Sequence, residues 1–354
     1  MSNSKKEKIL TLESLRGIAA LCVALYHYPS TSFLFFPNGH YAVYFFFILS
    51  GFVISLNYSD KIITFKDLIN FQIKRFYRLY PLHFFTLFLV LFVQICKYFF
   101  ISDGSLDYLS NNSHWYSFKN FIGNLFLIQA VFNDFYIFSW NGVSWSISTE
   151  FYTYFIFGFL FFIVKKYKFL IIIAFSYIIY NNDFFNGTRY LNNLFYLCIY
   201  NFSLGYFCYC LYKIINFRLN NIVTILFLII LLIVKVNYQS IFYQNKEFFF
   251  FLIILFVALL NKNNFFFKLL HLKFLVFLGS ISYSFYLIHQ ITIYLFIQFC
   301  KFVIKINFIK NIDGYVINTG NMYYDTLIHI SYISLSILFA FFLHKYIELR
   351  YIKK

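Results

Sequence analysis

Charged residues are scarce in this sequence of 354 residues: Asp, Glu, Lys and Arg together make up 12%, and only 13 residues are acidic. Hydrophobic residues make up 61%, apolar runs recur along the whole length, and the mean hydropathy is +0.71. A soluble domain of this size would need far more polar surface, so the composition excludes that class. The sequence predicts an all-α, polytopic integral membrane protein that forms a single domain over residues 1–354.

Proline is also rare, with three residues, and no internal repeat is visible. Secondary transporters commonly combine inverted repeats with helices interrupted by Gly or Pro. Both absences therefore weigh against the alternative function, a transporter or a lipid-linked glycan flippase. The six cysteines fall in apolar segments without the spacing of metal ligands, so we expect no metal site. The net charge of +16 fits basic loops that set membrane orientation, and we expect no nucleic-acid partner.

Ten apolar segments are candidates to span a membrane: 12–28, 40–58, 80–101, 145–164, 168–182, 191–212, 219–236, 247–260, 280–303 and 326–345. An eleventh, 120–138, is short and carries polar residues such as Asn124 and Asp134. If it does not span, the side of the two termini holds 20 Lys and Arg and the opposite side holds seven; if it spans, this asymmetry largely vanishes. The positive-inside rule therefore predicts ten spans with both termini in the cytoplasm, in a bacterial cytoplasmic membrane.

Two ionisable residues, Arg16 and His27, lie inside the first apolar segment. Ionisable side chains are costly in hydrocarbon, so each of them indicates a functional site. Eleven residues make about three turns of an α-helix, which places both side chains on one face, about 16 Å apart along the axis. Such a pair would suit a long anionic cofactor held between a cation and a titratable imidazole.

Five short motifs follow one another along almost the whole chain. They are Leu12–Gly17 followed by His27, Phe45–Phe52, Lys74–Pro81, Trp145–Phe151 and Leu278–His289. Together, on a chain with ten expected spans, they resemble membrane acyltransferase family 3, the O-acyltransferases that modify surface polysaccharides and related acceptors. The chain departs from the family pattern at Glu13-Ser14, where Asp-Gly is usual, and at Glu348-Leu349-Arg350, where Glu-x-Pro is frequent. We expect both departures to be peripheral to the Arg16/His27 pair.

The resemblance implies an enzyme that transfers an acyl group, in the first instance acetyl, from cytoplasmic acyl-CoA to a hydroxyl of a cell-surface or lipid-linked glycan. Acyl-CoA is then a donor substrate, and no cofactor is bound permanently. The expected partners are acyl-CoA, the glycan or glycolipid acceptor, membrane lipids and, where transfer is completed outside, a separate periplasmic or extracellular transferase. A third alternative, a glycan polymerase, would usually need a larger loop than 102–144.

Two residues are candidates for catalysis. His27 can act as a general base toward the acceptor hydroxyl, or can carry the acyl group as an acyl-imidazole. Glu150 can orient the imidazole of His27 and stabilise its charged form. Alternatively, Glu150 is a carboxylate that the helix dipole favours in a first helical turn.

The remaining candidates would bind the donor. Arg16 is the intramembrane cation, and the basic segment 71–81, expected as a cytoplasmic loop, supplies Arg75 and Arg78 for the phosphates, unless these two only follow the positive-inside rule. Ser280 is expected at the start of the ninth span, where a helix N-terminus would bind an anion or a side chain would simply cap the helix. Three residues on one helix face would line the acyl-CoA channel or satisfy one another: Tyr283, Tyr286 and His289.

Overall fold

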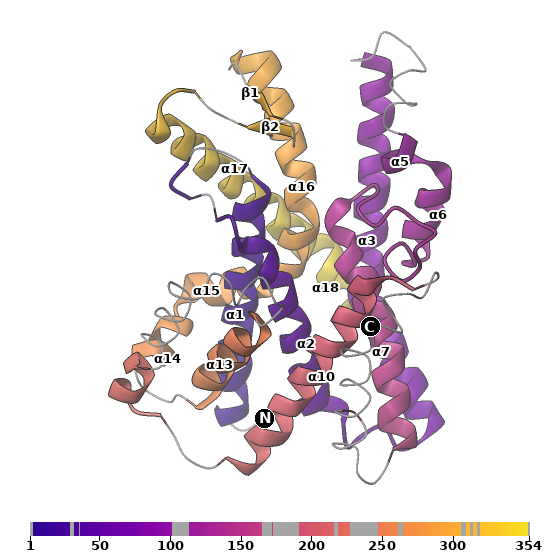
Figure 1. Cartoon of the computed structure of the whole chain (residues 1–354), viewed down its shortest axis with the longest axis vertical. Helices are drawn as coiled ribbons and strands as arrows, with labels where there is room; N and C mark the ends of the chain where they lie inside the picture. The colour runs from indigo at the N-terminus through magenta and orange to yellow at the C-terminus, as the bar shows by residue number, and fades with distance from the viewer. Residues whose placement is uncertain are drawn as a thin grey trace.

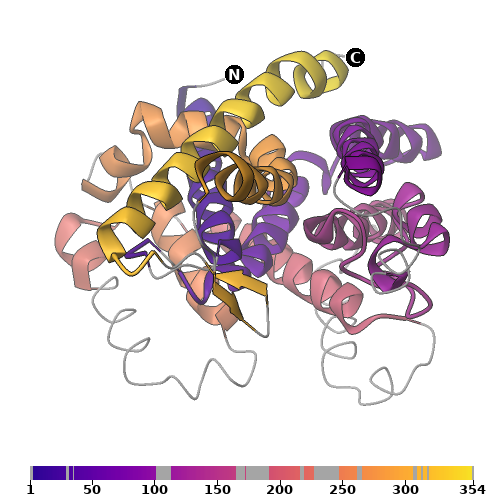
Figure 2. The ribbon, with the colours of Figure 1, turned by 90° about the horizontal axis from the view of Figure 1, so that it is seen from above.

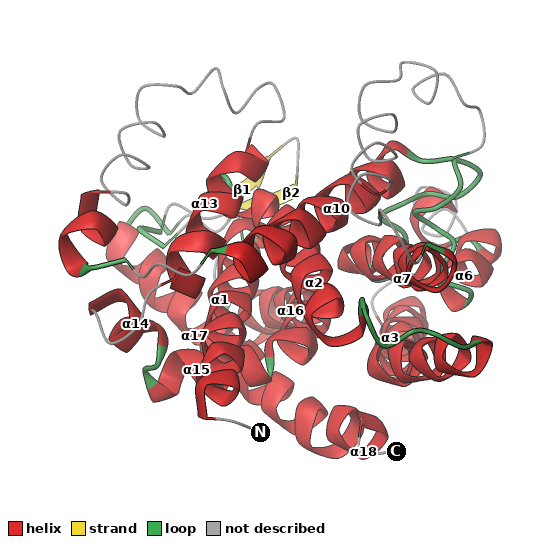
Figure 3. Ribbon diagram, turned by 90° about the horizontal axis from the view of Figure 1, so that it is seen from below, coloured by secondary structure: helices red, strands yellow, loops and turns green. Residues whose placement is uncertain are grey.

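The structure of the chain is a computed structural model that describes residues 3–28, 32–34, 36–100, 113–164, 172, 191–215, 219–226, 247–260, 265–305, 309–311, 314–316 and 319–352. Within these residues the regular structure is helical except for a small antiparallel hairpin of β1 (Ile309–Asn311) and β2 (Gly314–Val316) and one isolated bridge between Phe132 and Leu191. Figure 3 shows that most of the described residues are in helices. The expected all-α fold class is confirmed.

The helices are labelled in Figure 1. They are α1 (Asn3–His27), α2 (Ala42–Tyr58), α3 (Phe65–Phe100), α5 (Ser113–Tyr116), α6 (Phe118–Leu125), α7 (Trp145–Ile163), α10 (Asn193–Ile214), α13 (Glu247–Leu260), α14 (Phe265–Leu270), α15 (Lys273–Ser280), α16 (Ser282–Phe299), α17 (Met322–Leu343) and α18 (Leu349–Ile352). Short turns adjoin several of them: the 3₁₀ turns η1 (Gly39–Tyr41) and η2 (Gly142–Ser144), and the π-helical turns η3 (Cys300–Ile304) and η4 (His344–Glu348).

Five helical stretches are long and apolar enough to cross a membrane, and a sixth candidate is the pair α15 and α16, which is bent by 74°. The five are Gly39–Tyr58, Phe65–Phe99, Gly142–Ile163, Asn193–Ile214 and Met322–Tyr351. The chain is therefore an integral membrane protein. The expected spans 168–182 and 219–236 lie mostly outside the described residues, and α1, whose first half is charged, is not one of the five. The number of ten spans and the orientation of the termini stay predictions.

The segment 120–138 does not form a spanning helix. α6 ends at Leu125, and its eight residues are about 12 Å long, whereas the hydrocarbon core is about 30 Å thick. The rest of the segment consists of turns, and Leu127 adopts a positive φ of 56°. This agrees with the expectation that 120–138 stays out of the count of spans.

The segment 71–81 is helical, which corrects the expectation of a loop. α3 begins at Phe65, where Thr64 and Asp67 cap each other: the Thr64 N–H donates to Asp67 at 2.8 Å and the Asp67 N–H donates to Thr64 Oγ1 at 3.2 Å. This reciprocal capping starts the helix well before its apolar run. Arg75 and Arg78 consequently lie three residues apart on a rigid helix.

α1 runs through the middle of the molecule, with α13, α14 and α15 on one side and α2 and α10 on the other (Figure 1). It contacts α2, α15 and α16, whereas α3 packs on α7. Seen from above, α3, α6 and α7 form one side of the molecule and α13 to α15 form the other (Figure 2). Contacts of α16 with α1, α3 and η2 join the two sides, so this helix stands where they meet.

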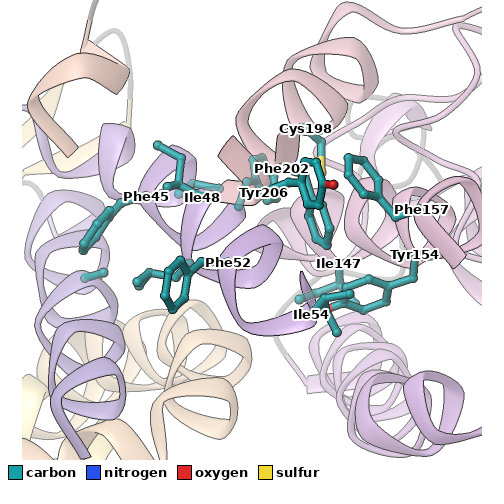
Figure 4. Close-up of a cluster of buried hydrophobic side chains, with 14 of the residues drawn as sticks. Phe45, Ile48, Phe52, Ile54, Ile147, Tyr154, Phe157, Cys198, Phe202 and Tyr206 are labelled. Carbon is teal, nitrogen blue, oxygen red and sulfur yellow. The ribbon is translucent and has the colours of Figure 1, made fainter. Parts of the chain in front are cut away.

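Small residues allow α2 and α10 to pack with their backbones in contact. A Cβ built on Gly51 would overlap the backbone of Phe202, and a Cβ on Gly205 would overlap the carbonyl of Ile48. Close backbone approach through small residues is the usual way for membrane helices to associate. Figure 4 shows the buried side chains around this contact, where Phe202 of α10 lies beside Phe157 and Tyr154 of α7.

Candidate active site

Arg16 and His27 lie on one uninterrupted helix, as the sequence predicts. Gly17 holds α1 against the end of α15, because a Cβ at this position would overlap the backbone of Leu278 and Gly279. α1 therefore lies directly on the bend between α15 and α16. Each of the two residues lines a cavity of its own.

The Arg16 cavity lies between α1, α2, α7 and α16. Its empty volume is about 390 Å³ when the open space at its mouth is counted, and the space that water-sized molecules can occupy is about 30 Å³. The walls combine hydroxyl groups, one carboxylate and one guanidinium with apolar side chains. The lining residues are Arg16, Val43, Phe46, Phe47, Ser50, Ser146, Ile147, Glu150, Ser282, Tyr283 and Tyr286.

Within the described part of the chain, Arg16 makes no hydrogen bond or ion pair. The charges of Arg78, Glu150 and Glu348 act on it from the surrounding helices. A guanidinium carries five N–H donors in a fixed plane. Its donors thus stay available for an anionic ligand in the cavity.

Glu150 belongs to the Arg16 cavity, which corrects its predicted contact with His27. Both Ser50 Oγ and the Tyr154 hydroxyl donate to Glu150 Oε1 at 2.5 Å. Glu150 is the sixth residue of α7 and lies beyond its first turn, so the helix N-terminus does not explain its position; its carboxylate bonds to Ser50 of α2 and lies away from the end of α1. Within the described residues, the side-chain partner of His27 is another histidine.

That partner is His289 on α16. Nδ1 of His27 lies 2.9 Å from the Val23 carbonyl and 3.3 Å from Nε2 of His289, and Nδ1 of His289 lies 2.7 Å from the Tyr286 carbonyl. A carbonyl oxygen only accepts, so both Nδ1 atoms carry hydrogens when the rings are neutral. Nε2 of His289 is then a lone pair that shares the single Nδ1 hydrogen of His27 with the Val23 carbonyl, the closer acceptor, and Nε2 of His27 is an unprotonated lone pair. This is the tautomer that a general base requires.

The His27 cavity lies between α1, α3, α16 and the irregular segment before α7. It has an empty volume of about 750 Å³ including open space. Aromatic rings and side-chain amides dominate its walls. The lining residues are His27, Val90, Val93, Gln94, Tyr116, Trp140, Asn141, Gln290, Ile291, Ile293, Tyr294 and Ile297. The catalytic candidate thus faces a second and larger space than the cation does.

Arg78 is paired with Glu348, a residue that the sequence analysis treated as peripheral. The guanidinium donates to Glu348 Oε1 at 2.5 Å, while Ser284 Oγ and His344 Nδ1 lie 2.7 and 2.9 Å from Oε2. Glu348 is only 3% exposed. In the sequence Glu348 stands in a basic C-terminal segment, so only its burial in the structure shows that this charge needs a partner of opposite sign.

Arg75 points away from Arg78. Its guanidinium donates to the Tyr58 hydroxyl at 3.3 Å and lies 5.4 to 5.8 Å from the ring centroids of Tyr58, Phe71 and Tyr154. Arg75 therefore sits among aromatic rings of α2, α3 and α7. The structure does not bring the two arginines to one point.

The helix N-terminus predicted at Ser280 lies two residues later. Ser280 is the last residue of α15, and its hydroxyl donates to the Phe277 carbonyl at 2.7 Å. α16 begins at Ser282, whose buried hydroxyl has no partner among the described residues and lines the Arg16 cavity. An 18-residue helix thus directs its N-terminus, which favours anions, toward Arg16.

Tyr283 and Tyr286 both line the Arg16 cavity, as expected of a channel wall, and both also bond to the protein. The Tyr283 hydroxyl donates to the Leu79 carbonyl at 2.5 Å, and its ring lies under the Arg78 guanidinium at 5.8 Å. The Tyr286 hydroxyl lies 2.8 Å from Ser146 Oγ. Of the three residues expected on one face, only His289 belongs to the His27 end.

Comparison with known proteins shows the family to which the chain belongs. The sequence profile of the acyltransferase domain of family 3 matches residues 9–343. "Protein 2 in picA locus" of Rhizobium radiobacter is 37% identical over 106 residues, which cover 28% of this chain and 52% of that protein, so the chain spans about half the length of this curated relative. No solved structure matches the chain significantly. Because the profile covers nearly the whole sequence, the chain belongs to acyltransferase family 3.

Proposed function

We propose that this protein is an enzyme that transfers an acetyl group from acyl-CoA to a hydroxyl of a cell-surface or lipid-linked glycan. The observation that carries the proposal is the division of α1 between two cavities, with an unpaired guanidinium at one and a histidine of defined tautomer at the other. A donor with a polyanionic end and a distant reactive thioester fits this division. A hydroxyl acceptor fits the histidine end.

The donor would be held at the Arg16 cavity. Arg16 and the N-terminus of α16 at Ser282 present a cation and a helix dipole to the same space, and both favour phosphate oxygens. Tyr283 and Tyr286 add ring surface for the pantetheine arm. Arg78 would support Tyr283 and not contact the donor directly, because its guanidinium already binds Glu348 and covers the Tyr283 ring. Arg75 and Ser280 would contribute only through helix packing.

The chemistry would take place at His27. Nε2 removes the proton of the acceptor hydroxyl while the oxygen attacks the thioester carbonyl, and collapse of the tetrahedral intermediate breaks the C–S bond. The imidazolium then returns its proton to the departing CoA thiolate, so the histidine ends unchanged. In the alternative covalent route, Nε2 attacks the thioester first and carries the acetyl group until the hydroxyl displaces it.

The excess of Lys and Arg on the side of the termini supports a cytoplasmic supply of the donor. With 120–138 out of the bilayer, 20 basic residues lie on the side of the termini and seven on the opposite side. The proposal therefore includes ten spans, both termini in the cytoplasm and a bacterial cytoplasmic membrane. It also leaves room for a separate transferase partner on the outer side.

The test is a measurement of acetyl-CoA binding and CoA release by the purified protein in nanodiscs. Arg16→Ala should weaken acetyl-CoA binding by tenfold or more, because charge-assisted hydrogen bonds contribute about 1.5–3 kcal/mol each. Arg350→Ala, which removes an exposed arginine of α18, is the matched control and should bind normally. If the wild-type protein neither binds acetyl-CoA nor releases CoA, the proposal fails and the transporter or flippase alternative gains support.

A further inference from the structure

The His27 cavity contains buried polar atoms that none of the described residues satisfies. Asn141 is 1% exposed, and its Nδ2 donates to the Leu287 carbonyl at 3.0 Å. This bond fixes the amide, while Oδ1 has no hydrogen-bond partner among the described residues. Buried amide oxygens are almost always paired in folded proteins, so an unpaired one on a cavity wall indicates a ligand that donates to it.

The lining of this cavity contains a second atom of the same kind. The Tyr294 hydroxyl on α16 is buried and has no partner within the described part of the chain. Gln94 and Gln290 add two further amides to the lining. A ligand in this space would therefore meet several separate groups that donate or accept hydrogen bonds, as a molecule with many hydroxyls requires.

The remaining wall is aromatic and held in place. Trp140 Nε1 donates to the Ser117 carbonyl at 3.3 Å, and the indole packs edge-on against Tyr116 and Phe121 with centroid distances of 5.6 and 5.0 Å. Trp140 itself adopts a positive φ of 58°. Rigid rings beside fixed amides suit a ligand with an apolar C–H face and a polar edge.

The lack of charged residues in the lining of the cavity restricts the class of ligand further. Among the described residues that line this cavity, the ionisable side chains are His27 and the tyrosines Tyr116 and Tyr294, and none of the lining residues is Asp, Glu, Lys or Arg. Lys97 lies nearby, with its ammonium 5.2 Å from the Tyr294 ring centroid, but it is not a lining residue. The cavity thus matches a neutral ligand and offers no paired charge for a carboxylate or phosphate.

From this geometry we infer that the His27 cavity is the acceptor site and binds a neutral pyranose unit. Asn141 Oδ1 and the Tyr294 hydroxyl would bind two sugar hydroxyls while a third faces Nε2 of His27. Asn141 and Tyr294 are then specificity-determining residues. The inference rests on the proposed function, to which it adds that the acceptor binds in the His27 cavity and that its sugar unit is uncharged.

The test compares two buried asparagines in a purified acetyl-transfer assay. Asn201 on α10 has the same arrangement as Asn141: its Nδ2 donates to a backbone carbonyl at 2.9 Å, its Oδ1 is unpaired among the described residues, and it is 1% exposed. The acceptor probes are the neutral octyl glucoside, galactoside and mannoside, with CoA release and the mass of the glycoside as readouts. Octyl glucuronide is the anionic comparison.

At least one of the neutral glycosides should act as an acceptor and speed up CoA release. Asn141→Ala should raise the KM for that glycoside about three- to tenfold, as expected for one lost hydrogen bond, and leave the KM for acetyl-CoA unchanged. Asn201→Ala should leave both values within about twofold. Tyr294→Phe removes only a hydroxyl that has no partner among the described residues, so the variant should fold normally and also raise the KM for the glycoside.

Three outcomes would overturn the inference. They are no acceleration of CoA release by any neutral glycoside, a stronger effect of octyl glucuronide, or equal effects of Asn141→Ala and Asn201→Ala. If acetyl-CoA binds in an Arg16-dependent way in these experiments, the donor half of the proposed function survives and the acceptor site alone is wrong. If acetyl-CoA does not bind at all, the proposed function itself fails.

Discussion

The structure gives His289 a different position from the one that the sequence predicts. As one of three residues on a helix face it was expected to line the acyl-CoA channel, but its imidazole lies against His27. Its own Nδ1–H donates a hydrogen bond to the Tyr286 carbonyl, so its Nε2 is unprotonated and can accept a hydrogen bond. His289 is therefore a positioning residue for the tautomer of His27.

His27→Ala should reduce acetyl transfer by about 10²–10⁴-fold, the usual cost of a lost general base, and leave acetyl-CoA binding nearly intact. The reason is that the base acts on the proton of the acceptor, whereas the donor anion is held near Arg16. Binding and turnover measured on the same preparation check this. Loss of acetyl-CoA binding as severe as in Arg16→Ala would contradict the division of roles.

His289→Ala should lower kcat by about two- to tenfold, the worth of one hydrogen bond, and shift the pH profile of kcat/KM. His289→Gln keeps an acceptor and should restore part of the rate. His83→Gln is the control, because His83 is also fully buried but bonds to the Asn124 carbonyl at 2.8 Å. A purely structural His289 would lower stability without moving the pH profile.

At the scale of elements, the carboxylate of η4 connects three helical segments. Glu348 receives bonds from Arg78 on α3, from Ser284 on α16 and from His344 of its own turn η4. Ser284 and its neighbour Tyr283 belong to the first turn of α16, close to the Arg16 cavity. The packing of the C-terminal helix thus supports the donor site, and Glu348 lies at the centre of this support.

Glu348→Gln should destabilise the protein by about 3 kcal/mol, because it leaves a largely buried guanidinium without its counter-charge. Thermal unfolding in detergent measures the effect. Asp60→Asn is the matched control: the Lys213–Asp60 pair spans 2.9 Å but is 54% and 67% exposed, so its loss should cost well under 1 kcal/mol. Equal unfolding temperatures for the two variants would show that the Arg78–Glu348 pair stabilises the protein no more than the exposed Lys213–Asp60 pair does.

At the scale of the whole molecule, membrane orientation decides which cavity the cytosol supplies. The distribution of Lys and Arg predicts that 102–144 and 165–168 face opposite sides of the membrane. Single cysteines introduced into these two segments of a cysteine-free background should react with an impermeant maleimide from opposite sides. Reaction of both from the same side would contradict the ten-span topology.

The sequence was sufficient for properties that depend on local periodicity and on composition. A long apolar chain with few charges must satisfy its backbone within helices in a bilayer, so the membrane class and the all-α fold follow directly. The position of Arg16 and His27 on one helix follows from the 3.6-residue turn. The motifs also identified the family. The start of α3 at Phe65 was readable in principle from the Thr64/Asp67 capping pair.

Only the tertiary structure decided which of these residues meet. Glu150 lies with Ser50 and Arg16, His27 with His289, and Arg78 with Glu348, and each of these contacts joins helices far apart in the chain. Helix periodicity fixes the face of each side chain, but it does not determine which helices are neighbours. That choice depends on the fit of whole surfaces, such as Gly17 on α15 and Gly51 on α10, where the lack of a Cβ lets two backbones touch.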